Sequence, residues 1–104
     1  MYNSYKVTFD DTSPTLNDLV NKILDVTGLS IIYNDDDASI MCKDNNLSLG
    51  IERDTYLYTI FLPSPYLDYL LVSTIFSLIK LGGTYSGFMP QWAGKKWNEV
   101  QYLI

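Results

Sequence analysis

The segment LSLGIERDTYLYTIFL at residues 47–62 predicts a β-hairpin, around which the other elements can be placed. Over residues 47–52 apolar and polar side chains alternate, which is the pattern of a strand with one buried face. Residues 56–62 are β-prone and apolar on both faces, which predicts a central strand. Arg53 and Asp54 are interpreted as the turn between the two strands. Because this connection is short, it favours an antiparallel hairpin.

Three further strands are predicted upstream of this hairpin. Residues 5–9 alternate with period two, and residues 29–33 and 38–43 form two more short β-prone runs. The connections at residues 34–37 and 44–46 are rich in Asn and Asp, which are typical turn residues. The short gaps predict a largely antiparallel sheet of about five strands.

A first helix is predicted between the first two strands. Ser13 is expected to be its N-cap and Pro14 its first residue, and apolar side chains then recur at helical spacing over residues 16–24. Asp18 and Lys22 are spaced for an i,i+4 pair. Gly28 is the expected C-terminal stop.

A second helix is predicted after Pro63-Ser64-Pro65, with Ser64 as the N-cap and Pro65 at the first position. It is expected to run to Lys80 or Leu81, where Gly82-Gly83 ends it. Its side chains are apolar nearly all round, so we expect both of its sides to be covered. Leu71 and Ile75 are predicted core residues.

These elements predict one domain over residues 1–104 with an α+β fold. The expected order is β-α-β-β-β-β-α, with both helices on one face of the antiparallel sheet. An irregular aromatic segment follows at residues 82–97, and residues 95–104 fit either a helical turn or an edge strand.

Composition excludes several classes of function. The chain of 104 residues has no His and one Cys, which excludes a disulfide scaffold, a Cys/His zinc site and an imidazole-dependent triad. The net charge is -5, so nucleic acid is not an expected partner. No secretory signal and no apolar run long enough for a membrane span are recognised, so a cytoplasmic location is expected.

The acidic turn at Asp35, Asp36 and Asp37 is a candidate calcium site, but it lacks the glycine and distal glutamate of a calcium loop. Asp is favoured in hairpin turns without any metal. No phosphate-binding glycine loop and no base that activates a nucleophile are recognised. We therefore expect no metal, no cofactor and no enzyme activity.

Tyrosine is the most unusual component, with 9 Tyr beside 2 Trp and 4 Phe. Aromatic side chains are enriched at protein interfaces, where they bury a large area at low entropic cost. The glycines of residues 82–97 predict a surface loop that displays its aromatics, although a lid over the core is an equal alternative. The candidate binding residues are Tyr85, Phe88, Trp92 and Trp97, with Asp35, Asp36 and Asp37 attracting a basic partner.

The leading hypothesis for function is a non-catalytic protein-binding domain. In size, acidic charge and composition the chain resembles the bacterial immunity proteins that neutralise toxins. This resemblance implies a protein partner but no particular binding residues. Two alternatives remain: an accessory subunit that forms a homo-oligomer through the second helix, and a small-ligand carrier with a pocket between the sheet and the C-terminal segment.

Overall fold

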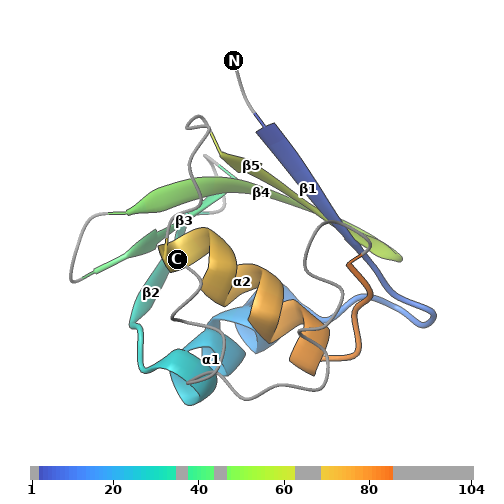
Figure 1. Cartoon of the computed structure of the whole chain (residues 1–104), viewed down its shortest axis with the longest axis horizontal. Coiled ribbons are helices and arrows are strands. Elements are labelled where there is room, and N and C mark those ends of the chain that lie inside the picture. The colour runs from blue at the N-terminus through green and yellow to red at the C-terminus, as the bar shows by residue number, and fades with distance from the viewer. Residues whose placement is uncertain (1–2, 35–37, 44–46, 63–68, 86–104) are drawn as a thin grey trace.

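The computed structural model describes residues 3–34, 38–43, 47–62 and 69–85, in which a five-stranded sheet carries two helices on one face (Figure 1). Along the chain the elements are β1 (Asn3–Thr8), α1 (Leu16–Thr27), β2 (Ile31–Asn34), β3 (Ser39–Cys42), β4 (Ser48–Asp54), β5 (Leu57–Leu62) and α2 (Tyr69–Lys80). The predicted α+β class and the order β-α-β-β-β-β-α are confirmed.

Every pair of neighbouring strands is antiparallel, and the spatial order is β1-β5-β4-β3-β2. β5 pairs with β1 on one side and β4 on the other, so it is an interior strand as its two apolar faces predict, although the middle strand of the five is β4. The predicted turn at Arg53-Asp54 is wrong, because Arg53 pairs with Tyr58 and Asp54 pairs with Leu57. The hairpin therefore turns at residues 55–56, and β4 is two residues longer than its apolar alternation indicates.

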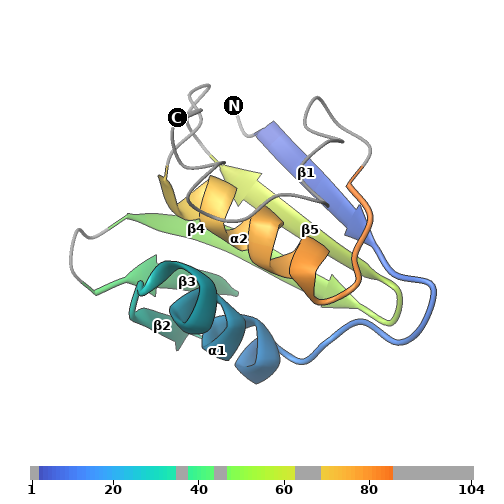
Figure 2. The same cartoon turned by 60° about the horizontal axis from the view of Figure 1, so that its bottom comes forward.

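The core lies between the sheet and α2, which crosses the sheet beside α1 (Figure 2). All nine residues from Leu70 to Leu78 are buried, which agrees with the expectation that both sides of this helix are covered. Leu71 and Ile75 are 0% and 2% exposed, so both predicted core positions are confirmed. By contrast, only Leu19 and Ile23 of α1 are buried, as befits a surface helix.

The start of α1 differs from the prediction. The N-cap is Thr15, whose hydroxyl accepts from the Asp18 N–H at 3.1 Å while the Thr15 N–H donates to the Asp18 carboxylate at 3.3 Å. This reciprocal capping box satisfies two backbone donors, whereas a single Ser cap would satisfy only one. Ser13 is buried instead, and its hydroxyl donates to the Asp54 carbonyl oxygen at 2.6 Å.

The capping box also explains why the predicted pair of Asp18 with Lys22 is not found. The Asp18 carboxylate accepts from the helix N-terminus, and the Lys22 ammonium lies 4.0 Å from the Asp25 carboxylate. This exposed contact is long, so it contributes little to stability.

Both helices end at the predicted glycines. Gly28 has a φ of 79°, and its N–H donates to the Leu24 carbonyl. At the end of α2, Gly82 has a φ of 103°, and the N–H groups of Gly82 and Gly83 donate to Ile79 and Leu78. This is a Schellman motif, and it requires a residue that tolerates positive φ at position 82. The predicted cap of α2 at residues 64–65 lies outside the described residues.

Candidate binding surface

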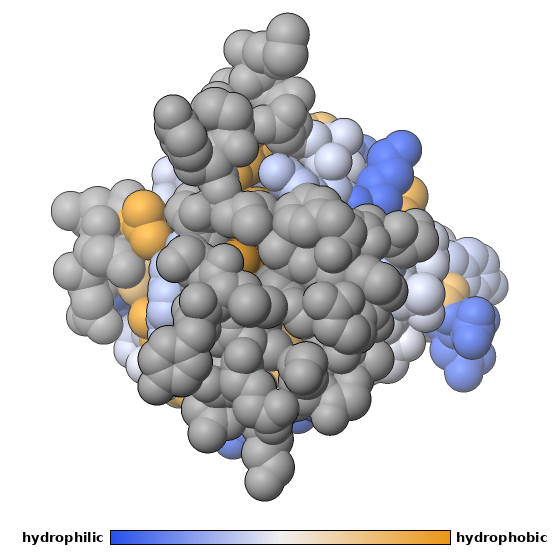
Figure 3. Space-filling model, in the orientation of Figure 1, coloured by the Kyte–Doolittle hydropathy of each residue, from blue (hydrophilic) through white to orange (hydrophobic). Residues whose placement is uncertain are grey.

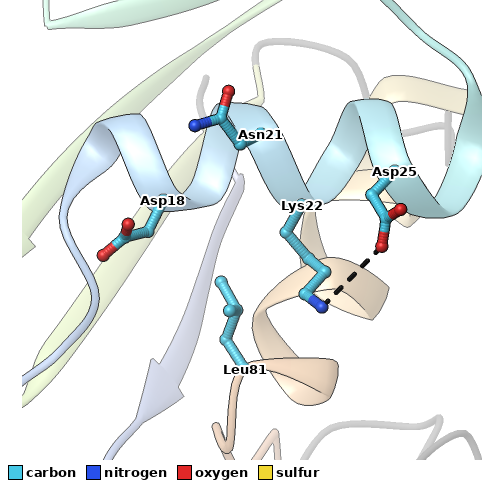
Figure 4. A pocket seen from close by; sticks show the side chains of 5 residues that line it. All are labelled: Asp18, Asn21, Lys22, Asp25 and Leu81. Atoms are coloured by element: carbon cyan, nitrogen blue, oxygen red, sulfur yellow. Dashed lines mark ion pairs between the residues drawn. The ribbon is translucent and has the colours of Figure 1, made fainter.

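Two open hollows meet at Leu81, the residue that follows α2. The first has a volume of about 270 Å³ and lies against α1 (Figure 4). The second has a volume of about 280 Å³ and lies against the loop between β1 and α1. We call the two together the Leu81 surface. It is lined by Phe9, Asp10, Asp11, Thr12, Asp18, Asn21, Lys22, Asp25, Leu81 and Gly82.

The charges on the Leu81 surface are mainly negative. Among the described residues that line it, four are aspartates and one is a lysine, and that lysine turns toward Asp25 in Figure 4. Figure 3 shows strongly hydrophilic side chains at the right edge, over the β1–α1 loop. Within residues 3–34, 38–43, 47–62 and 69–85, no group of three or more His, Cys, Asp or Glu is arranged to hold a metal ion. The aspartates instead line the same hollows as the apolar Leu81 side chain, a combination that suits a cationic side chain with an apolar stem.

The β4–β5 hairpin holds the loop that carries Asp10 and Asp11. The Ser13 N–H donates to the Thr55 carbonyl at 2.7 Å. The Arg53 guanidinium donates to the carbonyl oxygens of Ser13 and Pro14 at 2.7 and 2.8 Å. Hydrogen bonds from a charged donor are stronger than neutral ones, so Arg53 fixes the loop with its planar fork.

Tyr58 supports the same loop from beneath. Its hydroxyl donates to the Pro14 carbonyl at 2.5 Å, and its ring meets the Phe9 ring edge-on at a centroid distance of 6.1 Å. Burial raises the pKa of Tyr58 to about 12, because a phenolate at this position would lose its hydration. Packing and the hydrogen bond from Tyr58 therefore help to fix the loop that carries Asp10 and Asp11.

The raised pKa of Tyr58 predicts a loss of stability in alkaline solution. The unfolded chain ionises this tyrosine near pH 10 and the folded chain only near 12, so the stabilisation is complete below pH 10 and falls as the pH rises to 12. We expect the denaturant midpoint of Tyr58→Phe to fall less over this interval than that of the wild type. Parallel slopes for the two proteins would contradict the assignment of this dependence to Tyr58.

Of the candidate residues predicted from sequence, the structure describes only Tyr85. It is half-buried and packs against the core, and this burial raises the pKa of its hydroxyl. Its position fits the lid alternative better than a displayed loop. The remaining candidates, which lie outside the described residues, are Phe88, Trp92, Trp97, Asp35, Asp36 and Asp37.

No residue that lines the Leu81 surface was among the predicted binding residues. In the sequence, Asp10 and Asp11 have the pattern of a turn, and Asp18 has that of one half of an i,i+4 helix pair. The sequence does show acidic residues on two successive segments, and these could have indicated the Leu81 surface. Their convergence on Leu81 follows from the packing of α1 and α2, which are far apart in sequence, and so only the tertiary structure shows it.

Comparison with models of protein families, with curated proteins and with solved structures finds no match to this chain. Within the part of the chain that the structure describes, no helix is long and apolar enough to cross a membrane.

Proposed function

We propose that this chain is a non-catalytic protein-binding domain and that its Leu81 surface receives a basic partner. The observation that carries the proposal is that two hollows, each lined by two aspartates, share the partly buried Leu81. An apolar contact surrounded by charges of one sign combines a desolvated centre with a charged rim, which is the usual construction of a specific protein interface.

The distribution of charge supports a basic partner. Residues 1–68 carry a net charge of -7, while residues 69–104 carry +2. A field of this sign attracts a cationic protein over a distance of about one Debye length and raises its association rate. Asp35, Asp36 and Asp37 would add to the same field. A toxin neutralised by an immunity-like protein is the kind of partner that the composition favours.

The two alternative functions receive less support. A homo-oligomer through α2 needs an exposed apolar face, but residues 70–78 are buried within the chain. A small-ligand carrier was expected to enclose its ligand beneath the C-terminal segment, which lies largely outside the described residues. The Leu81 surface is open and flanked by charge, which suits a protein side chain better than a small apolar ligand.

The test removes charge from the loop without touching the capping box. In the variant Asp10→Asn/Asp11→Asn, we expect the association rate with a basic protein partner to fall about tenfold at low salt. The reason is that the electrostatic attraction that guides the partner to the surface is weaker. The difference between variant and wild type should shrink as salt is added. Association is measured by biolayer interferometry on the immobilised domain.

The matched control is Glu52→Gln/Asp54→Asn, which removes two exposed carboxylates from β4 and leaves the Leu81 surface unchanged. This control is expected to bind nearly as fast as the wild type. Equal losses in the two double variants would show that only net charge matters, and the Leu81 surface would then not be the binding site.

A further inference from the structure

The outer face of the sheet, which is turned away from both helices, carries an unusual arrangement of charges. Lys6 on β1 and Glu52 on β4 both pair with Thr59 on β5, so the three residues form one row across the sheet. Lys6 and Glu52 are exposed. Among the described residues, no ion pair is formed by either side chain. A lysine and a glutamate thus flank β5, one strand away on either side.

The central column of this face has two apolar side chains with a threonine between them. Leu57 and Phe61 on β5 are partly buried, and Thr59 is 7% exposed. Phe61 lies over Gly50 of the neighbouring strand, since a Cβ added at position 50 would lie 3.3 Å from the Cβ of Phe61 and 3.6 Å from its ring. Because Gly50 has no side chain, the Phe61 ring can pack directly against the backbone of β4.

We propose that a second copy of this chain stacks on this face, related to the first by a two-fold axis along β5. Such an axis places β1 of one copy over β4 of the other. Each Lys6 then faces Glu52 of the second copy, and this pair forms twice. The central column of each copy packs on itself, with Phe61 against Phe61. Each Asp54 faces a Thr8 hydroxyl of the other copy, because both pair with Leu57 in one row.

Charge selects this axis over the other two-fold arrangements of the same face. An axis along β4, the middle strand, would place Glu52 on Glu52 of the second copy. An axis along the row Lys6–Thr59–Glu52, perpendicular to the strands, would place Lys6 on Lys6 and Glu52 on Glu52. Like charges that face each other are destabilising. Of these three axes, only the one along β5 matches opposite charges at both positions, which is the self-complementarity that an isologous dimer requires.

The contact area of this dimer is small compared with that of stable dimers. Three strands of about six residues, about 4.8 Å apart and rising about 3.3 Å per residue, cover about 300 Å². Stable dimers bury about 800 Å² on each partner. The dimer is therefore weak and forms only at high protein concentration. It leaves the Leu81 surface of both copies open, so the dimer and the proposed function are independent.

The test is sedimentation equilibrium on the full chain from about 10 µM to about 1 mM, the range in which a weak dimer dissociates. We expect the wild type to approach the dimer mass within this range. Lys6→Glu and Glu52→Lys each create two like-charge contacts, so each should raise the dissociation constant about tenfold or more. The double variant Lys6→Glu/Glu52→Lys restores both pairs, and its dissociation constant should return to within about threefold of the wild type.

The matched control is Lys22→Glu, which makes the same change in net charge on α1, on the opposite side of the sheet, and should leave the dissociation constant unchanged. Circular dichroism melts confirm that each variant is folded. A wild type that stays monomeric at the highest concentration would overturn the proposal. So would a dimer that both single variants retain, or one that the double variant fails to restore.

Discussion

Replacing Leu71 by alanine is expected to lower the free energy of unfolding by about 2–5 kcal/mol. Leu71 is 0% exposed and lies near the start of α2, where every residue from Leu70 to Leu78 is buried. The substitution removes buried methyl and methylene groups and leaves a cavity that the neighbouring side chains fill only in part. For a chain of about this length, such a loss lowers the melting temperature by about 10 °C or more.

The matched control is Leu24→Ala on α1, because the chemical change is identical and Leu24 is 49% exposed. Alanine is a slightly better helix former than leucine, so this variant should change the free energy of unfolding by less than about 0.5 kcal/mol. Urea unfolding of both variants gives the comparison. Equal midpoints would mean that α2 does not occupy the centre of the core.

The sequence could predict the fold because local signals and tertiary packing agree in this chain. The alternation over residues 47–52 matches one buried face of β4, and the glycines at 28 and 82–83 end both helices. The errors lie where two local signals compete. Ser13-Pro14 is a plausible helix start, yet the capping box of Thr15 with Asp18 satisfies more backbone donors and determines the true start.

The end of β4 shows a second kind of error. Arg53 and Asp54 are polar, so they suggest a turn when they are considered alone. In the structure Arg53 is a strand residue that pairs with Tyr58 and holds the β1–α1 loop through two carbonyl oxygens. Its partners lie about forty positions earlier in the chain. A long-range role of this kind leaves no local pattern in the sequence.

The Leu81 surface could not be predicted for the same reason. Its aspartates come from the β1–α1 loop and α1, while Leu81 follows α2, some sixty residues later. Each segment alone is ordinary: an acidic turn, a solvated helix face and a leucine beside a glycine pair. The surface exists because the end of α2 comes to lie beside α1 and the loop, and this depends on how tightly the chain turns at Gly83.

The second large effect is therefore expected at Gly83. A Cβ added at this position would lie 2.5 Å from Cγ1 of Val7, 2.9 Å from the Leu78 carbonyl oxygen and 2.9 Å from Cζ of Phe9. All three distances are shorter than van der Waals contact. The Gly83 N–H also donates to the same Leu78 carbonyl at 2.9 Å, so the backbone cannot move away without losing the helix cap. We expect Gly83→Ala to lower the free energy of unfolding by about 3 kcal/mol, the upper range for overpacking a core.

Gly82→Ala provides the comparison, because Gly82 has no atom near its added Cβ but has a φ of 103°. Its cost is backbone strain alone, about 1–2 kcal/mol. The structure thus predicts that alanine lowers the free energy of unfolding more at Gly83 than at Gly82. Backbone conformation alone would predict the reverse order, because of the two glycines only Gly82 has a positive φ. Denaturant unfolding that ranks Gly82→Ala as the more harmful change would contradict the close packing of this turn.

The double variant Val7→Ala/Gly83→Ala identifies which contact of the added methyl group destabilises Gly83→Ala. Val7 is fully buried, so its own truncation is destabilising, but it also removes the Cγ1 atom nearest to the added methyl group. If that contact dominates, the double variant loses less free energy of unfolding than the two single variants lose together. If the losses simply add, the obstacle is the Leu78 carbonyl or the Phe9 ring, and in the first case the Schellman turn itself has opened. Leu81 lies inside this turn, so an opened turn would also displace the apolar centre of the proposed binding surface.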